Sequence, residues 1–315
     1  MKHHKLRTLI SLGAISTFVI HLFNRYTSMQ SGVKEVLPLY NYQYFSFKSG
    51  RIFYTKKGNG SPLLLIHELL PGGSGYEWNR IEDELSKEHT LYVVDLPGCG
   101  RSSKKGYQYT NSLFTQMITS FVKDVVREKC DVITSGNASS IILMAAFYQK
   151  NLFNKIIMVN PVSLSSISKP FDTTGKIYKT IIDMPIFGTL IYYMHVSKES
   201  VSSLIINQYY YNPFHADRDI MDAYYEASHI GGYHCKDLYA SLASHYYNAD
   251  LTKALNRLSV PVLIINGGSE KNQKRNVSGY LHCQPSLQCK TMYHCKHIPH
   301  VEKPSEFITI VKSFL

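Results

Sequence analysis

Cysteine is scarce in this sequence and is not arranged for a disulfide framework or a metal site. Six cysteines among 315 residues do not make a disulfide-dense scaffold. Cys283, Cys289 and Cys295 lie close together, but a structural zinc site needs four ligands at one point and the sequence has no Cys-x-x-Cys pair. We therefore expect no disulfide framework and no metal, and we expect no cofactor.

Other absences narrow the class of protein further. The sequence has no internal repeat and no low-complexity tract, which excludes a solenoid. Its residues are 44% hydrophobic and 18% charged, a balance that excludes a disordered chain, a collagen-like fibre and a coiled coil. A chain of this length and composition can bury a sizeable core in one large α/β domain or in two domains.

Acidic residues are outnumbered by basic ones, yet the excess is dispersed. Subtracting 23 Asp and Glu from 34 Lys and Arg leaves a net charge of +11. The positive charge forms only short, distant clusters: Lys56-Lys57, Lys104-Lys105 and Lys271, Lys274 and Arg275. Because no nucleic-acid-binding motif accompanies them, we interpret the charge as a solvated basic surface and expect no nucleic-acid partner.

The N-terminus carries the longest apolar run. Lys2, Lys5 and Arg7 are positively charged, and residues 6–23 are almost uninterrupted apolar or small, broken only by Arg7 near the start and His21 near the end. Roughly 16–18 helical residues rise about 25 Å, just short of a full hydrocarbon core. This pattern favours an uncleaved signal-anchor helix that binds a membrane through residues 6–24.

Two other interpretations of the apolar run remain open, a cleaved signal peptide and a surface-lying or packed helix. No Ala-x-Ala cleavage site follows Phe23, which weakens the first. If the helix is an anchor, the greater positive charge before it predicts a single-pass protein with a cytoplasmic N-terminus and an extracytoplasmic main domain.

The rest of the chain alternates between strand and helix patterns. Residues 26–40 suggest a polar linker ending at Pro38, and two alternating runs, 42–47 and 51–55, predict a hairpin. Further strands are predicted at 63–66, 91–94, 131–134, 155–159, 260–265 and 290–293, and helices at 78–88, 111–128, 139–150 and 304–314. Such repeats predict a mostly parallel sheet with helices on both faces.

One long segment interrupts this alternation. Residues 162–250 are rich in Tyr, Ser and helical patches and contain no clear strand. We therefore divide the chain into an anchor and linker over residues 1–40 and an α/β domain over residues 41–315, with an insertion at about 162–250.

Four segments in order resemble the α/β-hydrolase fold of serine hydrolases with a helical cap. The strand and turn at 63–69 resemble those that precede the oxyanion loop, and 93–102 resembles an Asp-x-Pro-Gly-x-Gly-x-Ser segment. Residues 262–270 resemble the strand and turn that present the acid, and 296–307 the ending that presents the base. The resemblance covers about residues 42–315 and implies that 162–250 form the cap.

The nucleophile of this fold sits at an elbow of the form small-x-nucleophile-x-small between a strand and a helix. The sequence there is Gly136-Asn137-Ala138-Ser139-Ser140. With Gly136 and Ser140 at the small positions, the nucleophile position holds Ala138. A shift by one places Asn137 at the centre, and a displaced Ser139 would need Asn137 and Ile141 at the small positions.

The resemblance also implies the other two members of a catalytic triad. His297 lies between a predicted strand and the last helix, where the general base belongs, and His300 is the fallback. Glu270 closes Gly267-Gly-Ser-Glu270 and matches the acid that would orient the imidazole. A solvated glutamate beside Lys271 and an ordinary loop histidine are the simpler interpretations.

The predicted oxyanion site departs from the usual His-Gly sequence, because Glu68 follows His67. By position, the backbone N–H groups of Leu69 and Ser139 would be the donors. A Glu68 side chain that points inward would disfavour a developing oxyanion.

These observations predict a membrane-anchored α/β-hydrolase homologue that has lost its serine nucleophile and is non-catalytic or weakly active. It would bind a ligand or partner, such as an apolar small molecule beneath the aromatic cap. Two alternatives stay open: a working hydrolase of esters or similar bonds that uses Ser139 or a water activated by His297, and a purely structural or partner-binding module. Whether the chain is an enzyme is therefore undecided at the level of sequence.

Overall fold

The structure is a computed structural model that describes residues 2–30, 35–37, 39, 41–48, 50–104 and 108–315. Its centre is an eight-stranded sheet in the order β1-β2-β4-β3-β5-β6-β7-β8. The strands are β1 (Tyr42–Phe47), β2 (Gly50–Lys57), β3 (Ser61–Ile66), β4 (His89–Val94), β5 (Cys130–Ser135), β6 (Phe153–Val159), β7 (Val262–Gly267) and β8 (Gln288–Met292).

The sheet is mostly parallel, as the sequence predicts. β1 pairs antiparallel with β2 as the predicted hairpin, and β2 pairs antiparallel with β4. Every other neighbouring pair is parallel. The carboxyl ends of β3, β5, β6 and β7 therefore meet at one edge of the sheet, where loops can bring distant residues together.

Helices cover both faces of the sheet, and each face has its own core. On one face pack α3 (Asn111–Phe121), a π-helical turn η2 (Val122–Val126), α4 (Ser139–Tyr148) and α12 (Gln273–Cys283). On the other face lie η1 (Gly75–Trp78), α2 (Glu82–Leu85), α13 (Pro299–Glu302) and α14 (Pro304–Phe314). The helix predicted over 78–88 is thus shorter, a 3-10 turn followed by a single helical turn.

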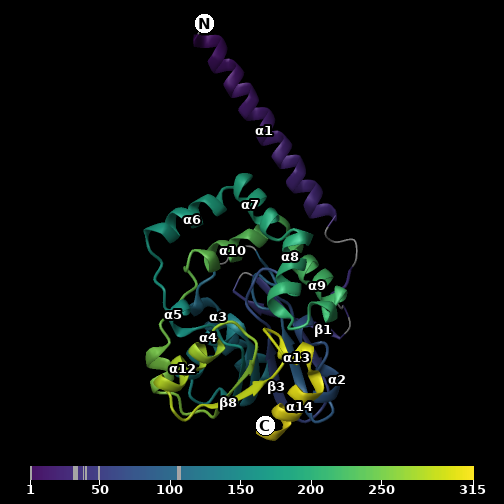
Figure 1. Ribbon diagram of the computed structural model, residues 1–315, viewed down its shortest axis with the longest axis vertical. Coiled ribbons are helices and arrows are strands. Elements are labelled where there is room, and N and C mark those ends of the chain that lie inside the picture. The colour runs from purple at the N-terminus through teal and green to yellow at the C-terminus, as the bar shows by residue number, and fades with distance from the viewer. Residues whose placement is uncertain (1, 31–34, 38, 40, 49, 105–107) are drawn as a thin grey trace.

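The segment between β6 and β7 is helical and caps the edge of the sheet where the parallel strands end (Figure 1). Its helices are α5 (Leu164–Ile167), α6 (Thr173–Asp183), α7 (Phe187–His195), α8 (Lys198–Leu204), η4 (Ile205–Tyr209), η5 (Pro213–His215), α9 (Arg218–His229), η6 (Gly232–His234), α10 (Cys235–Ala243) and α11 (Thr252–Asn256). This arrangement places cap side chains directly above the loops that follow the parallel strands.

The N-terminal helix α1 (Lys2–Gln30) projects away from the α/β domain, and its C-terminal end lies beside α7 (Figure 1). It is longer than expected, because residues 26–30, assigned to the linker, contain no Pro or Gly to end a helix. Pro38, the predicted end of the linker, lies outside the described residues.

The membrane-spanning prediction is wrong. Among the described residues, no helix combines the length and the apolarity that crossing a bilayer requires. Ser11, Thr17 and His21 interrupt the apolar positions of α1, and Asn24 is buried and donates from Nδ2 to the carbonyl oxygen of Ile186 in the cap at 3.0 Å. The single-pass topology, with a cytoplasmic N-terminus and an extracytoplasmic main domain, is therefore also wrong.

A short N-terminal strap, residues 36–37, ties the cap to the α/β domain. The Glu226 carboxylate on α9 accepts hydrogen bonds from the backbone N–H groups of Val36, at 2.5 Å, and Leu37, at 3.4 Å. Arg101, in the loop after β4, donates to the Leu37 carbonyl oxygen at 2.8 Å and pairs with Glu226 at 3.6 Å. The strap thus connects groups on both sides of the boundary between cap and sheet.

Candidate active site

The structure brings His297 and Glu270 together at the edge of the sheet where the parallel strands end. His297 follows β8, Glu270 follows β7, and His297 Nδ1 lies 3.6 Å from Glu270 Oε1. Gly267 permits this approach, because a Cβ atom there would lie 1.9 Å from the Lys296 carbonyl oxygen. The two predicted residues therefore form an ion pair rather than a close hydrogen bond.

The loop that carries His297 is fixed by its backbone. Asn160, which follows β6, donates from Nδ2 to the carbonyl oxygens of Lys296, at 2.9 Å, and His297, at 2.8 Å. The Asn160 Oδ1 atom accepts from the N–H of Gly267 at 3.1 Å. One amide side chain thus connects the loops that carry the imidazole and the acid.

Glu68 is the third group at this site, and its side chain points inward. Its Oε2 atom lies 2.9 Å from His297 Nε2 and accepts a hydrogen bond from the Tyr209 hydroxyl at 2.9 Å. Glu68 is buried, and Tyr209 comes from the cap and also lies against the imidazole ring. The nitrogen that would contact a nucleophile in a triad therefore contacts a carboxylate.

The elbow has a different register from the one predicted. β5 ends at Ser135, and the next residue, Gly136, has a φ of +51°, whereas Ala138 has helical angles, φ −66° and ψ −19°. The strained position of a strand-to-helix turn is the one that carries the nucleophile. That position is Gly136 and not Ala138, because glycine adopts a positive φ without steric cost.

The space beside Gly136 is filled by Glu68. A Cβ atom on Gly136 would lie 2.5 Å from Glu68 Oε1 and 2.7 Å from Glu68 Cδ, so the Glu68 side chain would have to shift to admit it. The Glu68 carboxylate thus occupies the position of a side chain on the strained residue. The sequence identified Glu68 as unusual, but its spacing does not reveal this contact.

The remaining elbow residues, Ser139 and Ser140, do not hydrogen-bond to His297 Nε2. Ser139 Oγ is buried with no hydrogen-bond partner among the described residues, and His297 Nε2 contacts Glu68 instead. Ser140 Oγ donates to the Asn137 carbonyl oxygen at 2.9 Å and lies 2.7 Å from the hydroxyl of Tyr247. These contacts hold the start of α4 against the cap.

The loop after β3 is held by His67. Its Nε2 atom accepts from the N–H of Leu96 at 3.0 Å, so Nδ1 carries the proton and donates to the Glu68 carbonyl oxygen at 2.7 Å. Leu69, a predicted oxyanion donor, is fully buried behind this turn. With Gly136 at the strained position, the second donor by position becomes the N–H of Asn137 rather than that of Ser139.

The charges around His297 favour its protonated form. Burial by itself lowers the pKa of His297, but the carboxylates of Glu68 and Glu270 raise it well above its usual value. The two carboxylates thus favour the imidazolium form of His297. An imidazolium has no lone pair with which to accept a proton from a nucleophile.

His300, the fallback base, belongs to a separate buried pair. Its Nε2 atom lies 3.3 Å from Glu77 Oε1, and its ring packs on Trp78. Glu77 also accepts from the backbone N–H of Glu68 at 2.8 Å. Burial raises the pKa of Glu77, but the bonds from His300 and Glu68 outweigh it and lower that pKa overall. This pair supports the Glu68 turn from behind.

A cavity of about 610 Å³ lies between the cap and the loop after β3. Its apolar walls include Leu70, Val196, Val201 and Leu204. Tyr224 also lines it, and the Tyr224 hydroxyl is buried with no hydrogen-bond partner among the described residues. A group that enters this cavity would meet these apolar side chains, the unpartnered Tyr224 hydroxyl and polar side chains such as Glu199 and Gln208.

Comparisons with known proteins agree with this architecture. A model described as "Alpha/beta hydrolase family" matches residues 63–310. A pyrrolizixenacetamide deacetylase from Xenorhabdus hominickii is 22% identical over 285 residues, covering 84% of this chain and 94% of the relative.

Solved structures give the same fold at low sequence identity. A serine hydrolase involved in carbazole degradation aligns with a TM-score of 0.71 at 16% identity, over 87% of this chain and 97% of that one. The epoxide hydrolase CorEH aligns with a TM-score of 0.72 at 18% identity over the same shares.

Proposed function

The chain belongs to the alpha/beta hydrolase family, and from this premise we propose that it is a homologue that binds a ligand without cleaving it through a serine. One observation carries the proposal: Gly136 holds the strained elbow position, and the Glu68 carboxylate fills the space beside it and bonds to His297. The nucleophile is thus absent, and its place is taken by a negative charge.

Three features of this site oppose the serine-hydrolase reaction: they concern the nucleophile, the oxyanion and the general base. Glycine has no side-chain oxygen to form an acyl-enzyme. A tetrahedral intermediate would develop negative charge beside the Glu68 carboxylate, whereas catalysis requires donors there. The raised pKa of His297 favours its imidazolium form, which has no lone pair with which to act as a general base.

For the ligand, we favour an apolar small molecule beneath the cap. The cavity of about 610 Å³ is within the range of small-molecule sites and has mainly apolar walls. The unpartnered hydroxyl of Tyr224 would hydrogen-bond to a polar group of such a ligand, because a buried hydroxyl without a partner is costly.

Reaction with a fluorophosphonate probe tests the proposal. The wild-type protein should not be labelled, and Ala138→Ser should not be labelled either. Gly136→Ser alone should stay silent, because its Cβ would clash with Glu68 at 2.5 Å. The double variant Glu68→Gly with Gly136→Ser removes the clash and the charge, and should be labelled at residue 136 and hydrolyse short acyl esters.

Other results would favour the working-hydrolase alternatives. Labelling of the wild-type protein at Ser139 would mean that a displaced serine is active. Ester turnover that survives Ser139→Ala but disappears in His297→Ala would support a water activated by His297. A folded double variant that stays unlabelled would mean that the scaffold lacks more than the nucleophile.

A further inference from the structure

A second cavity, of about 300 Å³, lies on the face of the sheet opposite α3 and α4. Phe53 and Thr55 of β2 and Val93 of β4 form its floor, and η1 and the start of α2 form one wall. The strap residues Val36 and Leu37 close another side. None of these residues belongs to the site around His297.

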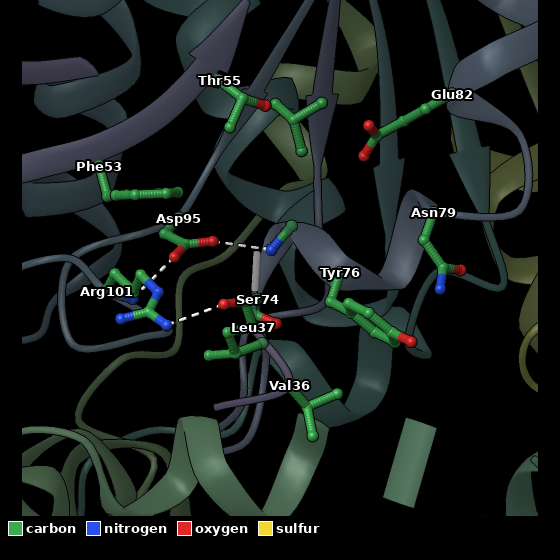
Figure 2. A pocket seen from close by; sticks show the side chains of 12 residues that line it. Val36, Leu37, Phe53, Thr55, Ser74, Tyr76, Asn79, Glu82, Asp95 and Arg101 are labelled. Atoms are coloured by element: carbon green, nitrogen blue, oxygen red, sulfur yellow. Dashed lines mark hydrogen bonds between the residues drawn. The ribbon is translucent and has the colours of Figure 1, made fainter. Parts of the chain in front are cut away.

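Two acceptor side chains of the cavity, those of Asn79 and Glu82, lie together on one side. In Figure 2, Glu82 and Asn79 lie opposite Phe53, Asp95 and Arg101. Asn79 Oδ1 is buried with no hydrogen-bond partner among the described residues. Lys57 attracts Glu82 electrostatically, but its ammonium group bonds to Asp83 instead. Two acceptor groups therefore face the cavity, and no donor from the described part of the chain is paired with them.

On the opposite side of the cavity, Asp95 and the Nη2 atom of Arg101 have partners, whereas Arg101 Nε is buried without a hydrogen-bond partner among the described residues. Asp95 accepts hydrogen bonds from the backbone N–H groups of Gly75 and Arg101, both at 2.7 Å. The Arg101 guanidinium pairs with Glu226 at 3.6 Å and donates to the Leu37 carbonyl oxygen at 2.8 Å. The charge of Arg101 is thus largely balanced and leaves the acidic side of the cavity to attract a cation.

The rest of the lining suits an organic cation rather than a bare metal ion. Phe53 and Tyr76 present aromatic rings, and Val93 adds apolar surface. Aromatic faces attract ammonium groups through their quadrupoles and also bury hydrocarbon. No described group of three or more His, Cys, Asp or Glu side chains converges as a metal would require.

We propose that this cavity binds a small primary ammonium compound, with its charged end between Glu82 and Asn79 and its hydrocarbon part against Phe53 and Tyr76. The carboxylate supplies the charge, and the amide oxygen accepts a second N–H. The site is separate from the His297 site and does not depend on the function proposed there.

The protonation of Glu82 supports the proposal. Burial raises the pKa of Glu82 to about 7, only partly offset by Lys57, because no donor compensates the charged form. A bound ammonium group would be that donor and would ionise the carboxyl. Binding at pH 7 should therefore release about half a proton.

Calorimetric titration with benzylammonium at pH 7 and pH 8 tests the site, and benzyl alcohol is the neutral ligand of similar shape. The wild-type protein should bind benzylammonium, and benzyl alcohol should bind at least ~10-fold more weakly. Repeating the pH 7 titration in buffers of different ionisation enthalpy should reveal the released proton.

Two neighbouring glutamates on α2 provide the matched comparison. Glu82→Gln should weaken benzylammonium binding at least ~10-fold and abolish the proton release. Glu84→Gln should change neither, because Glu84 is not part of the lining and pairs with Lys87 and Lys312. Absence of binding at millimolar concentration, equal binding of the alcohol, or undiminished binding to Glu82→Gln would overturn the proposal.

Discussion

Two inward-facing glutamates of this protein have opposite surroundings. Glu68 has a hydrogen-bond donor in Tyr209 and a cation in His297, so its charge is compensated within the fold. Glu82 has no such donor, and its pKa rises to about 7 because burial penalises the charged form. The same side chain therefore has a donor and an imidazole partner at one site, and a raised pKa without such a donor at the other.

The titration of Glu82 makes stability depend on pH. A carboxyl whose native pKa is raised binds a proton more tightly in the folded state, so stability falls as pH rises from about 4.5 to about 7 and then levels off. Lys57 opposes the shift and Asp83 adds to it. Glu82→Gln should therefore be more stable than the wild type at pH 8, by up to about 3 kcal/mol.

Urea unfolding at pH 5 and pH 8 measures this difference, with Glu84→Gln as the control. The gain in stability should be largest at pH 8 and much smaller at pH 5, where the native carboxyl, with its pKa of about 7, is still largely protonated. A gain that is equal at the two pH values would mean that titration of Glu82 is not its source.

At the scale of elements, the loop after β8 can approach the end of β7 because Gly267 has no side chain. A Cβ atom there would meet the carbonyl oxygens of Lys296, at 1.9 Å, and Cys295, at 2.7 Å. Gly267→Ala should push away the loop that carries His297 and lower the free energy of unfolding by about 1–3 kcal/mol.

Gly13→Ala is the matched control, because nothing lies within 4 Å of a Cβ at Gly13 in α1. It should leave stability unchanged or raise it by up to ~1 kcal/mol through helix propensity. Thermal unfolding of both variants and the NMR signals of the His297 ring measure the two effects. Unchanged ring signals in Gly267→Ala would contradict the expected displacement of the loop.

The elements themselves follow from the sequence more closely than the site does. The run at 63–66 is apolar because a strand inside a parallel sheet is buried on both faces, and this pattern identifies it directly. The elbow register does not follow, because Gly136 and Ala138 are both small and composition does not reveal which residue has a positive φ.

The contact between Glu68 and His297 also cannot be predicted from the sequence. The two residues are 229 positions apart, and only the packing of the loop after β3 against Gly136 decides where the carboxylate points. The apolar run near the N-terminus predicted a membrane helix, but among the described residues no helix is long and apolar enough to span a membrane. Local patterns thus predict strands well and long-range side-chain contacts poorly.

At the scale of the whole molecule, the strap at residues 36–37 limits how far the cap can move. Glu226→Gln should keep the fold but weaken the two backbone hydrogen bonds and the pairing with Arg101. Limited proteolysis should then cut between residues 30 and 41 faster than in the wild type, with the α/β domain still resistant. Equal cleavage rates would mean that packing of Leu37 alone holds the strap.

The strap also sets an order of events during synthesis on the ribosome. Val36 and its acceptor Glu226 are 190 residues apart, so the strap emerges long before its binding site exists. At roughly 5–20 residues per second, it waits about 10–40 s for α9. Until then the apolar Leu37 side chain, buried in the finished protein, is exposed to water. The N-terminal segment is thus made first and docks only after the cap has been synthesised.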